Sequence, residues 1–341
     1  MDMDTQSEAE VDPTTTTINP TDESINTSSD DNNVANQYLK QEQMIKEIAE
    51  QVKQQQSLTS ILLPISCLRQ QYTDNLNFIH EINLLERSYR HIRTIRGDGN
   101  CYYRAFLYSL LETVMMMIRQ QENDAKNTDN EGQRLLHYIT TKSWEDILQQ
   151  KYDEVAIEIF HDEIADLFQN VIVKRIYNEN NSGISSNTTA APPISKDTST
   201  SSFHDTMNEE NSVSDYCTWY LRLITATYMK QDPDRFVPFI LSSLHDNDDT
   251  SDVVCDIHQF CSKYIEPMGQ ECEHVQVLAL AEAFQIHVTV VYVDGRQTQS
   301  STKQNEDAHH CLHHHEFGPE QSPIRLTLLY RPGHYDILYK K

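Results

Sequence analysis

The spacing of apolar residues predicts helices through most of the chain and strands near its end. From Cys101 onward, apolar side chains recur at intervals of three and four residues, which is typical of a helix with one buried face. After residue 285 the period becomes two, which is typical of a strand. The helix positions are Tyr103, Leu107, Leu110, Leu111, Val114 and Ile118, and the strand positions are Ile286, Val288, Val290 and Tyr292.

Other segments extend this order of elements. Further helices are predicted near residues 75–89, 142–150, 155–176, 214–230, 252–264 and 275–284. Two more strands are predicted over 324–330 and 334–339, separated by the turn Arg331-Pro332-Gly333. Helices first and strands last indicate an α+β fold, with helices flanking a small, mostly antiparallel C-terminal sheet.

Composition divides the chain into folded and unfolded parts. Residues 1–36 are rich in Asp, Ser, Thr and Asn, and they are expected to form a disordered acidic tail. One domain is predicted over 37–341, beginning with a polar helical arm at about 37–56. A low-complexity insertion rich in Ser, Thr and Asn is predicted at about 178–214, with shorter inserted loops at 245–251 and 298–322.

Charge and cysteine content narrow the class of protein. The 341 residues carry a net charge of −25 and show no basic stripe, which argues against a nucleic-acid partner. The start of the chain has no positive segment or apolar run, so no signal peptide is expected. The most apolar window, Val275–Val293, is too polar to cross a membrane. The seven cysteines are therefore expected to be free thiols, in a cytoplasmic or nuclear protein.

Cys101 is the candidate nucleophile. A cysteine attacks as its thiolate, which a helix N-terminus or a neighbouring imidazolium favours. Cys101 follows the tight turn Asp98-Gly99-Asn100 and begins a helix, so the N–H groups there are suited to hold an oxyanion. Taken alone, a cysteine on an amphipathic helix is more often a small buried apolar residue.

His334 and Asp336 are the candidate base and its partner. They lie two residues apart on a predicted strand, so their side chains share one face. An aspartate in this position can fix the histidine tautomer and stabilise the imidazolium. A lone His-x-Asp pair on a strand is usually incidental, so this assignment needs further support.

Two long motifs supply that support. The segment Arg96-Gly-Asp-Gly-Asn-Cys-Tyr-Tyr-Arg-Ala-Phe106 resembles the nucleophile motif of the OTU deubiquitinases, and of their otubain branch in particular. Tyr330-Arg-Pro-Gly-His-Tyr-Asp-Ile-Leu-Tyr-Lys340 is similar to the otubain C-terminal motif. Segments 215–228 and 266–284 also match, and the resemblance covers about 37–341 apart from the insertions.

The resemblance implies a papain-like OTU cysteine protease fold and hydrolysis of isopeptide bonds after the C-terminal glycine of ubiquitin, as in polyubiquitin chains. It assigns Cys101 as nucleophile, His334 as general base and Asp336 as its orienting acid, with the Asp98 backbone in the oxyanion hole. It implies ubiquitin and polyubiquitin as partners, and no cofactor. The family usually has proline where this chain has Gly97, which should loosen the turn.

The alternative function is that of a non-catalytic regulator, which binds ubiquitin and ubiquitin-conjugating enzymes. In that mode the arm at 37–56 would engage the charged conjugating enzyme. The presence of all three triad residues favours catalysis, and the two modes can coexist.

A histidine-rich segment invites a metal assignment. His309-His-Cys-Leu-His-His-His315 contains five histidines and a thiol. A structural site would need these ligands held tetrahedrally by the fold. Since the segment lies in a predicted loop, we expect it to be solvated and to hold no physiological metal.

Overall fold

The computed structural model describes residues 54–120, 128–175, 202–244, 256–295 and 312–341, together with residues 40, 43, 44, 47 and 50–52. The chain divides into two units, Met1–Ile48 and Ala49–Lys341. All elements named below belong to the second unit. The predicted tail at 1–36 lies outside the described residues, and so does half of the predicted arm at 37–56.

A six-stranded mixed sheet forms the centre of the second unit. Its strands follow the order β1-β2-β6-β5-β3-β4; β3 and β5 are parallel, and every other neighbouring pair is antiparallel. The strands are β1 (Leu63–Pro64), β2 (Tyr89–Arg93), β3 (His287–Tyr292), β4 (His314–Phe317), β5 (Arg325–Arg331) and β6 (His334–Lys340). The predicted α+β class and mostly antiparallel sheet are confirmed.

The prediction that the sheet is wholly C-terminal was wrong, because β1 and β2 come from the first third of the chain. β1 has only two residues, and β2 contains three basic residues, so neither shows an alternating apolar pattern. β2 joins the sheet by pairing with β6, with Ile92 opposite Leu338. This pairing places the segment before Cys101 beside the strand that carries His334.

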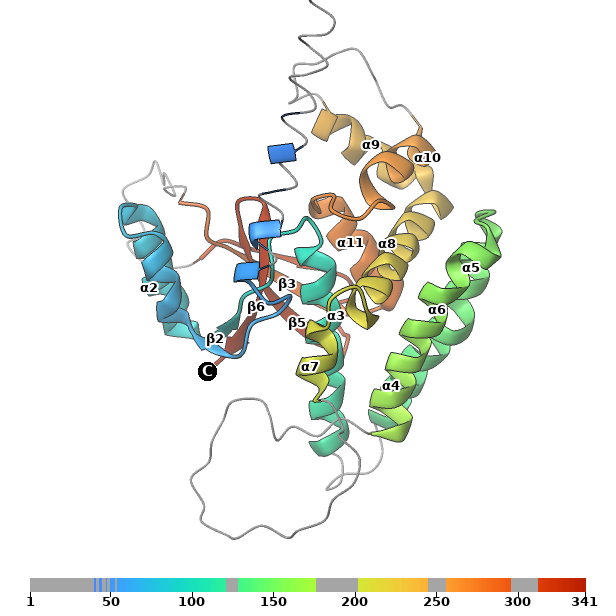
Figure 1. Ribbon diagram of the computed structural model, residues 1–341, viewed down its shortest axis with the longest axis horizontal. Helices are drawn as coiled ribbons and strands as arrows, with labels where there is room; N and C mark the ends of the chain where they lie inside the picture. The colour runs from blue at the N-terminus through green and yellow to red at the C-terminus, as the bar shows by residue number, and fades with distance from the viewer. Residues whose placement is uncertain are drawn as a thin grey trace, which may run out of the picture. The chain divides into compact units, whose positions relative to one another are not determined.

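Helices cover both faces of the sheet (Figure 1). One face packs on α2 (Leu76–Ser88) and the short helix η1 (Ile65–Gln71), through a cluster that includes Ile82, Leu85 and Leu329. The other face packs on α3 (Cys101–Gln120) and α11 (His274–Phe284), and α8 (Val213–Gln231) packs on these two helices, through the largest core cluster. Three layers result, as expected for the papain-like arrangement.

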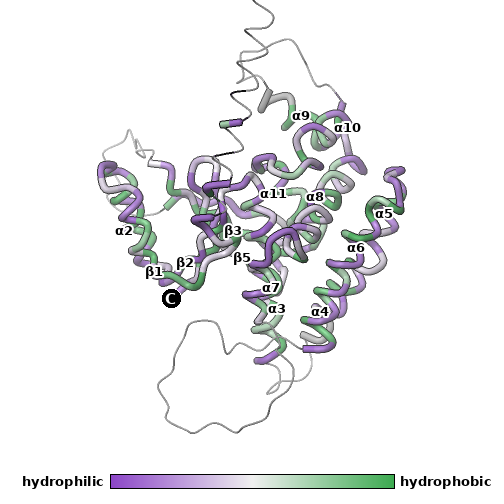
Figure 2. Tube along the Cα trace, viewed as in Figure 1, coloured by the Kyte–Doolittle hydropathy of each residue, from purple (hydrophilic) through white to green (hydrophobic). Residues whose placement is uncertain are grey.

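The remaining helices lie outside these layers. They are α4 (Thr128–His137), α5 (Ser143–Gln149), α6 (Glu154–Gln169), α9 (Pro233–Leu244) and α10 (Ile257–Phe260), with π-helical turns at Tyr138–Lys142, Asn170–Lys174 and Cys261–Ile265. Hydrophobic and hydrophilic positions alternate along α2, α6 and α8, as amphipathic helices require (Figure 2). Among the described helices, none combines the length and apolarity needed to span a bilayer.

The predicted end of the low-complexity insertion, at 214, was wrong. Ser202 caps α7 (Phe203–Asn208) in a capping box with Asp205. Phe203 packs on Tyr108 with ring centroids 4.9 Å apart, and Met207 is also buried. The count of Ser, Thr and Asn could not separate a helix cap from disorder. Residues 178–201 of the predicted insertion, and the predicted loop at 245–251, lie outside the described residues.

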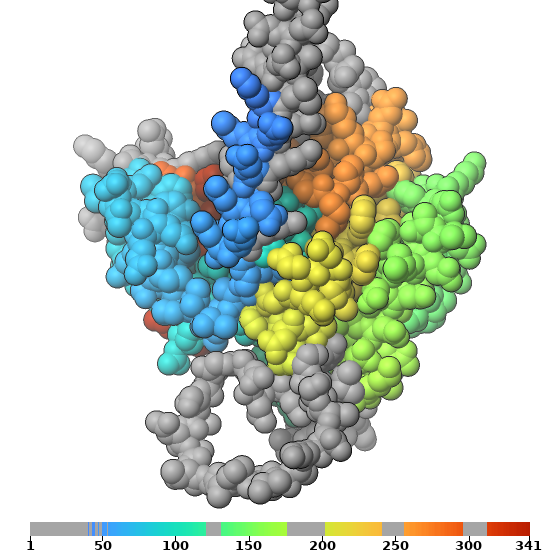
Figure 3. Space-filling view, in the orientation of Figure 1, coloured from blue at the N-terminus to red at the C-terminus, as the bar shows by residue number. Residues whose placement is uncertain are grey.

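α7 is anchored to an early part of the chain. The backbone N–H of Thr59 donates to Oδ1 of Asn208 at 2.8 Å, and Figure 3 shows the yellow segment that carries α7 against the blue segment near this residue. Arg96, just before the nucleophile turn, forms an ion pair with Glu210, which follows α7. This short helix therefore supports the segment that leads to Cys101.

Candidate active site

Cys101 is the first residue of α3, directly after the turn Asp98-Gly99-Asn100. The helix behind it is anchored in the largest core cluster, and Cys101 itself is buried. The N-terminus of a helix presents unpaired N–H groups and the positive end of the helix dipole. Cys101 thus lies where a thiolate is stabilised, at the position the sequence predicts.

His334 begins β6 and connects the other two residues of the predicted triad. Its Nε2 lies 3.0 Å from Oδ1 of Asp336, and Cys101 lies near enough to its imidazole to raise the pKa of the ring. Sheet pairing places β6 beside the segment before Cys101, because β2 leads directly into that segment. The structure therefore brings Cys101, His334 and Asp336 together in one site, with the His334–Asp336 pair joined by a hydrogen bond.

Asp336 is fully buried and surrounded by donors. Oδ1 accepts from the Ile95 backbone N–H at 2.9 Å, and Oδ2 accepts from Nε of Arg331 at 3.0 Å and from its Nη2 at 2.5 Å. Burial alone would raise the pKa of Asp336, but His334, Arg331 and the Ile95 amide hold it below the ordinary value. The carboxylate is therefore ionised at neutral pH and fixed in orientation.

The charge state of His334 follows from these neighbours. Burial alone would lower the pKa of His334, but hydrogen bonds to Asp336 and Cys101 raise it to about 9. An imidazole with this pKa carries a proton at neutral pH. Its charge stabilises a neighbouring thiolate, and its proton is available to a leaving group.

Asp98 lies in the nucleophile turn, but its N–H group is already engaged. That N–H donates to the Arg96 carbonyl at 3.1 Å, across Gly97. In this conformation it is therefore not a free donor for an oxyanion at Cys101. The Asp98 carboxylate instead accepts from the Asn100 N–H at 2.9 Å and forms an ion pair with Arg104 at 2.9 Å. The predicted oxyanion role of the Asp98 backbone therefore requires the peptide at Gly97 to rotate.

Three contributors to the site were missed by the sequence analysis. The Ile95 amide had no sequence signal, because its role depends on sheet pairing. Arg331 was assigned only to a turn, although it lies within the C-terminal motif. Arg222, on α8, is completely buried and binds the nucleophile turn. Its signal was a charged residue inside the otherwise apolar run Tyr220-Leu-Arg-Leu-Ile.

The comparisons with known proteins agree with this geometry. The family model of Peptidase C65 Otubain matches residues 50–340. The chain belongs to the otubain family. Ubiquitin thioesterase OTUB1 of Homo sapiens is 32% identical over 294 residues, covering 86% of this chain and 87% of that protein. A deubiquitinating enzyme of Arabidopsis thaliana, named for its ovarian tumor domain, is 29% identical over 288 residues, covering 82% and 79%.

Solved structures of otubains share the fold. A structure titled h/ceOTUB1-ubiquitin aldehyde-UBC13~Ub matches with a TM-score of 0.67 at 23% identity, covering 90% of this chain and 99% of that one. A ceOTUB1 ubiquitin aldehyde UBC13~Ub complex matches with a TM-score of 0.64 at 25% identity, covering 88% and 99%. The papain-like OTU arrangement predicted from the motifs is thereby confirmed.

A cleft of about 650 Å³ opens next to the otubain triad. Gly333 and Tyr335, the neighbours of His334, line one side, and the segment Gly269–Gln276 lines another. Phe260, Tyr264 and Tyr330 supply aromatic walls. The cleft thus lies beside the triad, with the residues on either side of His334 in its wall.

The predicted loop over 298–322 was wrong for its last part, which holds β4. Within this otubain, residues 314–317 pair with β3, and His315 lies close to His274 and Tyr292. The Tyr292 hydroxyl lies 2.5 Å from Nε2 of His274 and 3.2 Å from Nδ1 of His315. His309, His310 and Cys311 lie outside the described residues. Within the described ranges, no group of three potential ligands converges on a metal position.

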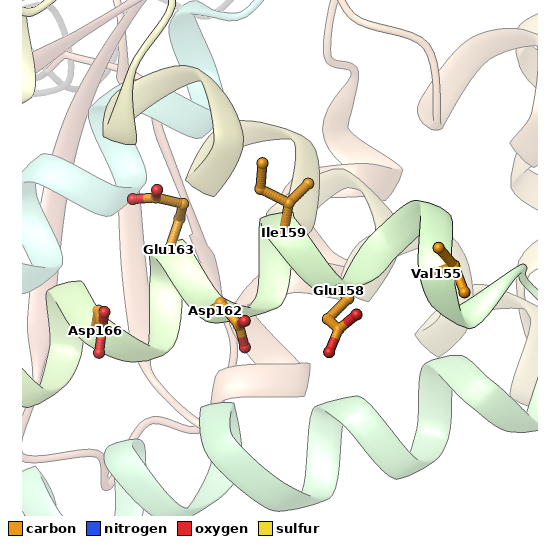
Figure 4. Close-up of a pocket in the computed structure, with 6 residues that line it drawn as sticks. All are labelled: Val155, Glu158, Ile159, Asp162, Glu163 and Asp166. Carbon is orange, nitrogen blue, oxygen red and sulfur yellow. The ribbon is translucent and has the colours of Figure 1, made fainter.

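A second hollow, of about 330 Å³, follows the outer face of α6 (Figure 4). Four carboxylates and two apolar side chains line it, and none of the triad residues contributes to it. Val155 is 80% exposed there. No neighbour of a triad residue lines this hollow, whereas the residues on either side of His334 line the larger cleft, so the otubain chemistry belongs beside that cleft.

Proposed function

We propose that this chain is a cysteine-type deubiquitinase, which hydrolyses the bond after the C-terminal glycine of ubiquitin in conjugates and polyubiquitin chains. The observation that carries the proposal is that Cys101 lies beside the hydrogen-bonded pair His334–Asp336 in a member of the otubain family. The relatives named as ubiquitin thioesterases support the substrate class.

The mechanism follows from the charge states in the site. The thiolate of Cys101 attacks the carbonyl carbon of the last ubiquitin glycine, and the carbonyl oxygen becomes an oxyanion beside the N-terminus of α3. The imidazolium of His334 gives its proton to the lysine amine, which leaves as the bond breaks. His334, now neutral, removes a proton from water, which attacks the thioester and releases ubiquitin. Asp336 fixes the ring orientation throughout.

Replacement of the nucleophile tests this function. Cys101→Ala should abolish release of a fluorophore from the ubiquitin C-terminus, and it should prevent labelling by a ubiquitin probe with a C-terminal electrophile. The fold should persist, because alanine is well tolerated in helices. Cys217→Ala, which changes another buried cysteine on a helix, is the matched control and should retain activity. Equal labelling of the Cys101→Ala variant would exclude Cys101 as nucleophile.

A second function is favoured by the complexes of the relatives. The OTUB1 structures contain ubiquitin aldehyde together with UBC13~Ub or UBCH5B~Ub, which are ubiquitin-charged partners. We propose that this chain also binds a ubiquitin-charged conjugating enzyme, through the helical arm at about 37–56. Removing residues 1–54 should weaken this binding and raise KM for diubiquitin. It should hardly change hydrolysis of a ubiquitin–fluorophore, which has no second ubiquitin; equal loss on both substrates would contradict the proposal.

A cytoplasmic or nuclear site of action completes the proposal. Its support is that Cys67, Cys101, Cys217, Cys261 and Cys272, the described cysteines, are all free thiols. Fractionation followed by probe labelling at Cys101 would test it. Labelling restricted to secreted material would contradict it.

A further inference from the structure

Arg222 is a buried cation at the back of the nucleophile turn. It projects from α8, its side chain is fully buried, and its guanidinium carbon lies 4.5 Å from the centroid of the Tyr103 ring. Burial of a charge is unfavourable unless hydrogen bonds replace the lost water. The contacts that Arg222 makes therefore indicate its structural role.

Those contacts join two separate segments. Nη2 lies 2.9 Å from the Gly99 carbonyl and 2.8 Å from Oδ1 of Asn100, both in the turn before Cys101. The same atom lies 2.7 Å from the Gln270 carbonyl, and Nη1 lies 2.9 Å from the Ile265 carbonyl. All four acceptors are neutral oxygens, so the positive charge has no carboxylate in direct hydrogen-bond contact.

The two segments also touch each other directly. The Gly269 N–H donates to Oδ1 of Asn100 at 2.9 Å. A Cβ added to Gly99 would lie 2.0 Å from the Gly269 carbonyl oxygen, so only glycine permits this approach. The segment that contains Gly269 also lines the cleft beside the triad.

Arg222 thereby fixes one peptide of the turn. The Gly99 carbonyl accepts from Arg222, while the Asn100 N–H on the same peptide donates to Oδ1 of Asp98 at 2.9 Å. Both polar groups of the Gly99–Asn100 peptide are held. The peptide between Gly97 and Asp98 is not bound by Arg222, so a rotation that frees the Asp98 N–H would leave the Gly99–Asn100 peptide in place.

We propose that Arg222 is a positioning residue. It holds the Gly99–Asn100 peptide against the Ile265–Gln270 segment, so that this peptide keeps its place when the peptide at Gly97 rotates and the oxyanion donors form. Arg222 does not touch substrate; it acts through the backbone that does. The inference rests on the proposed hydrolase function and adds a residue to it. Its loss should lower the rate of the chemical step more than the affinity for ubiquitin.

The test compares Arg222→Met with Arg93→Met. Arg93 is a matched control because it is equally buried, but it binds the Ser60 carbonyl, Tyr339 and Glu112 instead of the nucleophile turn. With ubiquitin–fluorophore, and per folded molecule, Arg222→Met should lower kcat on the order of 10²-fold and leave KM within about threefold. Arg93→Met should lower thermal stability without this loss of kcat. Arg222→Lys, which keeps the charge and one donor group, should recover part of kcat.

A second readout separates positioning from general damage. Iodoacetamide alkylates Cys101 without forming an oxyanion, so its rate at Cys101, followed by peptide mass spectrometry, should change less than about threefold in Arg222→Met. If Arg222→Met does not fold, Asn100→Ala removes one acceptor of the same contacts and should show the same selective loss of kcat.

Two results would overturn the inference. One is a kcat per folded molecule that matches wild type in Arg222→Met, or in Asn100→Ala where Arg222→Met does not fold. The other is an equal fractional loss in alkylation and in turnover. An inactive wild-type protein would contradict the hydrolase function itself, which is a separate outcome.

Discussion

Replacing Asp336 by asparagine removes one charge from the centre of the site while keeping the shape of the side chain. The wild-type carboxylate accepts from His334, Arg331 and the Ile95 amide. Asparagine can retain one of these acceptor oxygens, but its NH₂ group would face a donor at the other position. The substitution therefore changes the charge and tautomer of His334 and leaves Arg331 without its buried partner.

The expected magnitudes follow from these contacts. The pKa of His334 rises from an ordinary 6.5 to about 9, which corresponds to about 3 kcal/mol in favour of the imidazolium. Asp336 supplies the largest raising contribution, so its loss should leave much of His334 neutral at pH 7.5. We expect kcat to fall on the order of 10²-fold or more. Arg331 would then keep only the neutral oxygens of Gln71 and Tyr72 as partners, which should destabilise the fold by roughly 1–3 kcal/mol.

A pH series on ubiquitin–fluorophore separates the two effects. In wild type, kcat/KM should decline above about pH 9, where His334 loses its proton. In Asp336→Asn this decline should begin at lower pH. The double variant Asp336→Asn/Arg331→Gln removes the unpaired cation, so it should recover melting temperature but not kcat.

The reasoning fails if Asp336→Asn retains wild-type kcat with an unchanged alkaline limb, because another residue would then orient His334. It also fails if the double variant recovers both melting temperature and kcat. That outcome would mean that Asp336 serves only to compensate Arg331.

Three further predictions concern the fold around the site. Gly99→Ala should abolish probe labelling, because φ is +74° and the added methyl group would collide with the Gly269 carbonyl; unchanged labelling would show that the turn can relax. Deleting 178–200 should leave the melting temperature nearly unchanged. Deleting 180–211 removes α7 and should lower the free energy of unfolding by about 3 kcal/mol. Equal melting temperatures would contradict the packing of α7. The raised pKa of His334 stabilises the fold fully below about pH 6.5, and this contribution is lost as pH rises through about 9, so wild type should lose more melting temperature over that interval than His334→Ala.

Local sequence determined much of this protein. The three- and four-residue spacing after Cys101 specified α3, and the period of two after residue 285 specified β3. The turn before Cys101 placed the nucleophile at a helix N-terminus, and the two-residue spacing of His334 and Asp336 placed them on one face. Each of these features depends on residues close together in the chain, so a local pattern can encode it.

Only the tertiary structure decided the features that join distant segments. β2 lacks an apolar alternation, and its place in the sheet comes from pairing with β6. α7 looked like low-complexity sequence, and it is ordered because Phe203 finds a partner in Tyr108. In the sequence, Arg331 is part of a turn, and Arg222 is a charged residue within an otherwise apolar helix. Asp336 lies only five residues from Arg331, across the β5–β6 turn. The Gly99–Asn100 peptide, in contrast, reaches Arg222 only through folding, because this buried charge needs partners that its own neighbours along the chain do not supply.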